Sequence, residues 1–226
     1  LFSESIIQNP NATGIPYREN YTYQVTPFDP ISVSYNKIIR DFKEAERLLT
    51  EHGEYFDRTD ENAGGFVKDR VIHMNLYAVQ ALLARVYWEK GDLETAKNYA
   101  MKVIDCPFFS MEDKTNVEDI MNGVISDKET IWGLYSEEFP NYTRDVMYSS
   151  GGSYYYDPKP DYREIYEVDQ DGFDYRLDKW FQTLSDHGAE GLRCMKVVDR
   201  FKVRLQTRPV TKLSGINMIR LPELYY

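Results

Sequence analysis

The strongest constraint on the fold of this chain is a pair of adjacent helical patterns between residues 71 and 107. Apolar side chains recur at helical spacing from about Val71 to Glu89. They occupy more than one face, as is typical of a helix buried between neighbours. Gly91 predicts the end of this helix, and Asp92 can cap a second one that stops before Pro107. The sequence therefore predicts a helix, a tight turn and a second helix packed against each other.

The side-chain sizes in this pair resemble the tetratricopeptide unit, a helix pair with a period of about 34 residues. Leu83, Ala84 and Tyr87 match the L-G-x-x-Y spacing of that unit, with Ala in place of Gly. Ala96 falls where the unit has its own Ala, and Ala100 replaces a later Phe. Small side chains let two helices approach closely while a tyrosine fills the gap. One such unit is visible in the sequence, without a tandem array.

Another helical stripe precedes the pair. Seven apolar side chains between residues 35 and 49 fall on one face of a helix. They are Tyr35, Ile38, Ile39, Phe42, Ala45, Leu48 and Leu49. Ser32 or Ser34 can cap the start of this helix, and Gly53 can end it.

Elsewhere the sequence predicts little regular structure. Residues 1–31 carry turn signals and predict an extended, irregular segment. Residues 128–135 predict a short strand or an extended segment. The alternating basic and apolar side chains of 193–208 fit a strand or a short amphipathic segment. Residues 216–221 lead into Pro222, a favourable first position of a helix, so a further helix is expected to start there.

The charge and the cysteine count exclude several classes of protein. There are 37 acidic against 27 basic residues, a net charge of -10, whereas nucleic-acid binding surfaces are basic. Cys106 and Cys194 are far apart, and they are either two buried thiols or one disulfide.

With only three scattered histidines, neither a metal site nor a cofactor is expected. No apolar run is long enough to span a membrane, and both ends look like cuts in a longer protein.

A tyrosine-rich segment is the first candidate for ligand binding. Tyr154, Tyr155 and Tyr156 are consecutive, Asp157 follows them, and Trp180 lies further along. Aromatic faces pack on the flat C–H faces of sugar rings, and carboxylates or hydroxyls bind the ring hydroxyls. The alternative is a tyrosine-rich loop packed against the helices.

Catalysis is the less favoured class of function. Two carboxylates suffice for glycoside hydrolysis, and 37 acidic residues will supply such pairs by chance. Glu129, Asp157, Asp161 and Glu164 are conceivable, but nothing singles them out. No Ser–His–Asp order, phosphate-binding glycine loop or HExxH motif occurs, so no catalytic residue is predicted.

Four segments, taken in order, resemble the SusD/RagB family of outer-membrane nutrient-uptake lipoproteins. They are Tyr35-x-x-Ile38-x-x-Asp41-x-x-x-Ala45-x-x-Leu48, Ala81-Leu82-Leu83-Ala84-Arg85-Val86-Tyr87-x-x-x-Gly91-Asp92, Glu129-Thr130-Ile131-Trp132, and Ile219-Arg220-Leu221-Pro222-Glu223-Leu224-Tyr225. Each is weak by itself, and the last is the most telling. The resemblance extends from about Tyr35 to Tyr226.

The resemblance implies a mostly α fold of tetratricopeptide-like helix pairs with long irregular loops and minor short strands. Residues 1–226 would be one segment of a single domain, because family members are typically about twice this length. Within it, 35–107 would hold the tetratricopeptide-like helices, 108–215 a loop-rich ligand face, and 216–226 the start of a further helix.

The function implied by the resemblance is non-catalytic capture of an oligosaccharide or other small nutrient at the cell surface. Such proteins deliver it to a TonB-dependent (SusC-like) transporter of the outer membrane. Membrane contact would be only through a lipid anchor that this segment does not contain. The alternative from the residues alone is a tetratricopeptide-type adaptor that binds a peptide in its helical groove, although adaptors usually stack at least three units.

Overall fold

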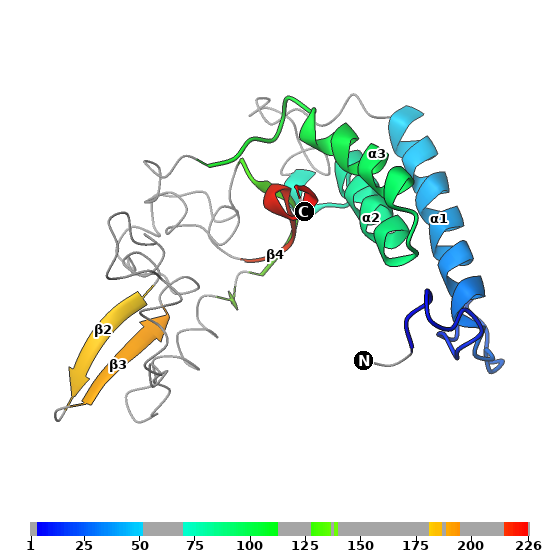
Figure 1. Ribbon diagram of the computed structural model, residues 1–226, viewed down its shortest axis with the longest axis horizontal. Helices are drawn as coiled ribbons and strands as arrows, with labels where there is room; N and C mark the ends of the chain where they lie inside the picture. The colour runs from blue at the N-terminus through cyan, green and yellow to red at the C-terminus, as the bar shows by residue number, and fades with distance from the viewer. Residues whose placement is uncertain are drawn as a thin grey trace. The chain divides into compact units, whose positions relative to one another are not determined.

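A computed structural model shows how these segments fold (Figure 1). It describes residues 4–51, 70–112, 128–136, 138–139 and 215–225, and the backbone alone of 181–186 and 189–194. The helices are α1 (Ile31–Glu51), α2 (Leu76–Glu89) and α3 (Leu93–Ile104), with short 3-10 helices η3 (Arg70–Ile72) and η7 (Leu221–Leu224). The strands are β1 (Thr130–Tyr135), β2 (Phe181–Asp186), β3 (Ala189–Cys194) and β4 (Gly215–Arg220). The predicted combination of dominant helices and a few short strands is confirmed for this part of the chain.

The chain divides into two compact units. The first joins Leu1–Ser110 to the last residues, Ile219–Tyr226, and so contains α1, α2, α3 and η7. The second is Met111–Met218, with β1, β2, β3 and most of β4. The first unit is therefore discontinuous in sequence.

Helices α2 and α3 form the predicted helix–turn–helix pair. Gly91 ends α2 in the left-handed conformation, with φ 85°, which a residue without Cβ adopts freely. The side chain of Asp92 then accepts a hydrogen bond from the amide of Thr95 at 3.2 Å, capping α3 as predicted. The start of the pair differs from the prediction, because the side chain of Asn75 caps α2 by accepting from the amide of Ala78. The helix therefore begins at Leu76 rather than at Val71, which lies in η3.

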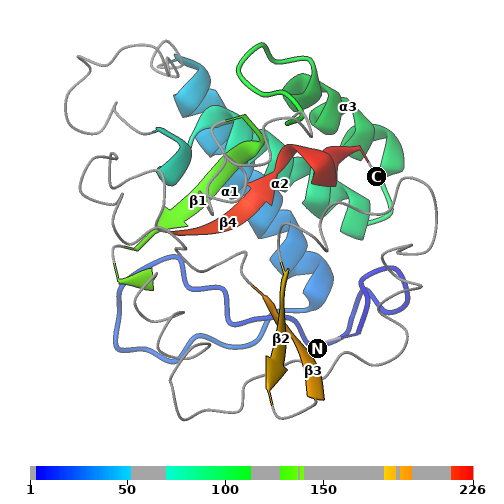
Figure 2. The same ribbon diagram turned by 90° about the vertical axis from the view of Figure 1, so that its left-hand side faces the viewer.

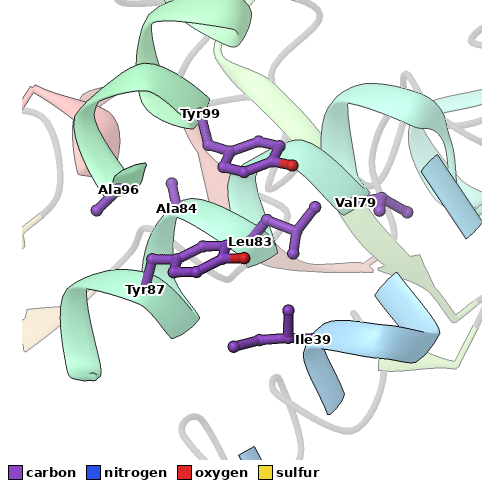
Figure 3. Packing of buried hydrophobic residues seen from close by; sticks show 7 residues of the cluster. All are labelled: Ile39, Val79, Leu83, Ala84, Tyr87, Ala96 and Tyr99. Carbon is purple, nitrogen blue, oxygen red and sulfur yellow. The ribbon is translucent and has the colours of Figure 1, made fainter. Parts of the chain in front are cut away.

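The three helices share one hydrophobic cluster (Figure 3). Its members are Ile39, Val79, Leu83, Ala84, Tyr87, Ala96 and Tyr99. The rings of Tyr87 and Tyr99 stack with centroids 5.8 Å apart and planes 7° from parallel. The two alanines on facing helices leave room for this stacked pair. Not every apolar face of α2 is covered, however, since Trp88 is 57% exposed.

The start of α1 corrects the predicted cap. The helix begins at Ile31, so Ser32 and Ser34 lie inside it. The amides of Ile31 and Ser32 donate to the backbone carbonyls of Ala12 and Pro10, at 2.8 and 3.1 Å. These bonds satisfy part of the first turn, which otherwise relies on a capping side chain. The predicted stop at Gly53 lies outside the described residues.

The strands form two small sheets (Figure 2). Strand β1 confirms the predicted strand at 128–135 and pairs with β4. Strands β2 and β3 pair antiparallel, from Phe181 opposite Cys194 to Asp186 opposite Ala189. Of the predicted strand or amphipathic segment at 193–208, only its first two residues, which end β3, are described. The predicted helix at 216–226 is a strand up to Arg220, followed by the four-residue η7 that contains Pro222.

Candidate functional site

The side chains predicted to bind ligand lie outside the described residues. These are Tyr154, Tyr155, Tyr156, Asp157 and Trp180. Of the acids weighed for catalysis, only Glu129 is described. It is buried, and its Oε1 accepts a hydrogen bond from the backbone amide of Glu112 at 2.9 Å. A shielded carboxylate that fixes the chain just before β1 fits a structural role better than a catalytic one.

Within each unit, a residue of a resembling segment contacts a residue that is distant in sequence. In the first unit, Arg85 Nη2 lies 2.6 Å from Glu223 Oε2, which joins α2 to η7. In the second unit, Thr130 Oγ1 lies 2.7 Å from Asn217 Oδ1, which joins β1 to β4. Leu221 is 1% exposed. Leu221 and Glu223 of the terminal segment therefore contribute to the packing of the first unit.

A polar node lies beside the hydrophobic cluster, centred on the carboxylate of Glu46 in α1. It accepts hydrogen bonds from Gln80 Nε2 at 3.1 Å, from the Tyr99 hydroxyl at 3.0 Å and from Lys102 Nζ at 3.0 Å. Its side chain is 17% exposed. Burial raises the pKa of Glu46, but the hydrogen bonds from Lys102, Gln80 and Tyr99 outweigh burial and hold that pKa below its ordinary value.

The partners of Glu46 are affected in turn. Burial, followed by the hydrogen bond to the Glu46 carboxylate, raises the pKa of Tyr99 to about 12. Lys102 Nζ also lies 4.4 Å from the centroid of the Tyr99 ring, a cation–π contact. With three donors already bound, the carboxylate is poorly placed to act as a general base. This cluster of hydrogen bonds was not predicted from the sequence, where its signal is a glutamate at the edge of the apolar stripe of α1.

The segment before α1 carries a second missed feature, a loop of residues 16–28 that we call the tyrosine loop. Its side chains Tyr21, Tyr23, Val25 and Phe28 are 96%, 101%, 91% and 65% exposed. Exposed apolar groups gathered in one segment are a mark of an interaction surface. The signal in the sequence was the alternation Tyr21-x-Tyr23-x-Val25.

Tyr17 in the same loop is fixed rather than free. Its hydroxyl donates a short hydrogen bond to Asp41 Oδ2 of α1. This bond, with burial and the charge of Asp41, raises the pKa of Tyr17 to about 12. The hydrogen bonds from Tyr17 and Arg40 hold the pKa of Asp41 below its ordinary value.

The described part of the chain contains one cysteine side chain, that of Cys106, and no cluster of metal-ligating groups. Cys106 is a buried free thiol in the described part of the chain, whereas the side chain of Cys194 lies outside it. It lies against Tyr77, whose pKa is raised to about 12 by burial and by the hydrogen bond with Cys106. Among residues with described side chains, no three His, Cys, Asp or Glu groups come together as metal ligands would. Nor is any helix described there long and apolar enough to cross a bilayer.

Comparison with solved structures identifies the fold. A SusD-like carbohydrate binding protein from Bacteroides vulgatus matches 98% of this chain with a TM-score of 0.64 and 22% identity. A surface glycan-binding protein A from Bacteroides uniformis matches 93% with a TM-score of 0.59 and 17% identity. A SusD superfamily protein from Bacteroides thetaiotaomicron matches 94% with a TM-score of 0.57 and 17% identity. The fold is SusD-like.

The chain spans less than half the length of these SusD-like structures, 44%, 47% and 46% of them in the order given. No protein-family model matches the sequence, and no curated protein sequence matches it. The resemblance to SusD-like proteins and the helix-rich fold expected from the four segments are confirmed by structure, at sequence identities low enough that the likeness concerns the fold alone. The tetratricopeptide-like character of the helix pair stays a prediction.

Proposed function

We propose that this chain is part of a non-catalytic protein that captures glycan at the bacterial cell surface. The main observation in support is the SusD-like fold over nearly the whole chain. This fold is shared with proteins described as carbohydrate-binding and surface glycan-binding. The full-length protein would be lipid-anchored at the outer membrane and would deliver its ligand to a TonB-dependent, SusC-like transporter.

The proposed ligand face lies within residues 108–215. Tyr154, Tyr155, Tyr156 and Trp180 would supply aromatic faces for sugar rings, and Asp157 would bind ring hydroxyls. The helices of 35–107 would be the rigid scaffold, built as a tetratricopeptide-like pair around the alanines and stacked tyrosines of α2 and α3. Loops on a rigid scaffold are a common arrangement for binding sites.

Glycan binding by the full-length protein tests this proposal. Calorimetry with glucan, xylan, mannan and galactan oligosaccharides should show binding to at least one of them, with no shorter products released on long incubation. Replacing all three of Tyr154, Tyr155 and Tyr156 with Ala should weaken that binding at least about tenfold. The matched control is Tyr225→Ala, which removes an exposed tyrosine directly after η7. Failure of every glycan to bind would refute the proposal.

The second candidate is a peptide-binding adaptor, favoured by the close packing of α2 on α3. Affinity purification of the full-length protein from its host distinguishes the two proposed functions. A TonB-dependent transporter retained with the protein supports nutrient uptake, whereas a peptide bound to the helices, and no transporter, supports the adaptor.

A further inference from the structure

The tyrosine loop leaves and rejoins the rest of the protein at a closed base. The amide of Gly14 donates to the carbonyl of Asp29 at 2.8 Å, and the amide of Ile15 donates to Ser34 Oγ at 3.3 Å. A Cβ at Gly14 would lie 2.5 Å from Ser34 Oγ and 3.0 Å from the carbonyl oxygen of Asp29, so a larger residue would disturb this approach. Lys37 Nζ, 2.8 Å from Asp29 Oδ2, ties the returning arm to α1. The base therefore fixes both ends of the loop.

On the outgoing arm, two side chains of the loop contact α1. The Tyr17 hydroxyl donates a short hydrogen bond to Asp41 Oδ2, and Glu19 Oε1 accepts a short hydrogen bond from Arg40 Nη2. Lys37 Nζ also lies 5.7 Å from the centroid of the Tyr17 ring, a cation–π contact. We call these contacts of Tyr17 and Glu19 with α1 the latch.

Beyond the latch, residues 20–28 have no such attachment. Within the part of the chain that the structure describes, they make no hydrogen bond or ion pair with other residues. Tyr21 and Tyr23 are 96% and 101% exposed, so these two side chains do not pack on the helices either. Figure 2 shows the blue segment before α1 as a broad loop without helix or strand. The position of the loop tip therefore depends on the latch and on the base.

The base and the latch differ in how strongly salt can weaken them. The side chains of the base ion pair, Lys37 and Asp29, are 26% and 22% exposed, whereas those of Arg40 and Glu19 in the latch are 57% and 43% exposed. Dissolved ions screen exposed charges more than shielded ones. An exposed ion pair also contributes little to stability at low salt. Salt should therefore weaken the latch while the backbone hydrogen bond of the base remains.

We propose that the latch makes the tyrosine loop a salt-sensitive strap on α1. At low ionic strength Tyr17 and Glu19 hold the outgoing arm against the helix. At higher ionic strength the arm separates from α1, and residues 16–28 move as one unit about the closed base. Local openings of this kind occur where few buried contacts hold a segment. Opening releases Arg40 and Asp41 from the loop and makes the loop backbone accessible to other proteins. This conformational change does not depend on the proposed glycan-binding function.

Limited proteolysis of the full-length protein with chymotrypsin measures the opening. Cleavage after Tyr21 needs an extended, accessible backbone on both sides of the bond, so its rate follows the population of the open loop. The rate is measured by mass spectrometry of the fragments and divided by that of a synthetic peptide of residues 14–29. This division removes effects of salt and of substitutions on the protease itself. Raising sodium chloride from about 0.01 M to about 0.5 M should increase the normalised rate about threefold or more.

Two variants separate the latch from its surroundings. Tyr17→Phe combined with Glu19→Ala removes both hydrogen bonds of the latch and keeps an aromatic ring at position 17. The normalised rate of this double variant at low salt should be about fivefold or more above that of wild type, and should change less than about twofold with salt. Arg18→Gln is the matched control, since Arg18 is exposed and makes no hydrogen bond or ion pair with any described residue. Its normalised rate should stay within about twofold of wild type at both salt concentrations.

Each of three results would overturn the inference. A wild-type normalised rate that does not change with salt shows that the loop is not salt-sensitive. A double variant cleaved as slowly as wild type at low salt shows that contacts other than the latch hold the loop. A lowered unfolding temperature of the double variant, with an equal rise in cleavage outside the loop, shows that the substitutions loosen the whole protein rather than the strap.

Discussion

Glu46 brings one negative charge to the place where three helices meet. Its donors come from α2 and α3, at positions 34, 53 and 56 residues further along the chain. A half-buried carboxylate is stabilising only while its donors remain in place, since a buried polar group without partners costs free energy. The node therefore specifies how α1 lies on the other two helices.

Replacing Glu46 with Ala should lower the free energy of unfolding by about 2 kcal/mol, because three donors lose a charged acceptor. Urea denaturation followed by circular dichroism measures this loss. Glu44→Ala is the matched control, since Glu44 pairs with Arg47 on the exposed face of α1 and should change stability by about 0.5 kcal/mol or less. Equal effects of the two substitutions would contradict a special role for Glu46.

Acid should weaken this node in a defined direction. The pKa of Glu46 is lower in the folded protein than its ordinary value of 4.5, so the stabilisation is complete above that value. It is lost as the pH falls through the folded pKa, where the carboxylate becomes protonated. Glu46→Gln has no carboxylate to protonate, so the difference in unfolding free energy between this variant and wild type should shrink as the pH falls below 4.5. A difference that stays constant with pH would contradict the charge-based explanation.

At this scale the sequence predicted less of the site than of the core. Ile39, Leu83 and Tyr87 were expected to be buried from helical periodicity, and they are. The role of Glu46 depends on contacts between three helices, which periodicity within one helix does not contain. The proposed ligand residues at 154–157 and 180 remain predictions.

The turn between α2 and α3 is an element whose sequence signals are local. Gly91 and Asp92 act on their own backbone and on the next turn of helix, so reading the chain in order was enough to place them. The start of α1 was missed for the opposite reason, because its first amides bond to carbonyls of Pro10 and Ala12. Because these partners lie about twenty residues away, the residues at the start of the helix do not predict them.

Gly91→Ala should lower the free energy of unfolding by about 1 kcal/mol, because a left-handed residue with a Cβ is strained. The nearest side-chain atom to the new Cβ is Ile7 Cδ1 at 3.4 Å, an ordinary contact, so backbone strain rather than a clash causes the loss. Gly91→Asn should lose less, since Asn adopts this conformation more readily. Denaturation of both variants measures the difference, and equal losses would argue against the strain.

For the molecule as a whole, the residues that end the chain matter to the helices near its start. Leu221 is 1% exposed, Leu224 packs on the cluster of Ile39 and Leu83, and Glu223 pairs with Arg85. The resemblance singled out this terminal segment from its letters alone, and the structure supplies the reason in its buried side chains. What the letters could not give was its partner, because the contact spans 138 residues.

Leu221→Ala should lower the free energy of unfolding by about 3 kcal/mol, as expected for a leucine removed from a fully packed position. Tyr225→Ala, four residues on and 59% exposed, should cost about 0.5 kcal/mol or less. Guanidinium denaturation of the two variants measures both. If Leu221→Ala were as mild as Tyr225→Ala, the terminal segment would not be part of the helical unit.

Because the first unit is discontinuous in sequence, its two parts leave the ribosome at different times. The ribosome must finish the whole of Met111–Met218 before Ile219–Tyr226 can emerge and complete the helical unit. During that interval the nascent helices lack Leu221 and Leu224, and their apolar surface is open to chaperones or to wrong partners. Closing so long a loop also carries an entropic cost that local helix formation does not. The helical unit therefore cannot contain all the contacts described here until Ile219–Tyr226 has been synthesised.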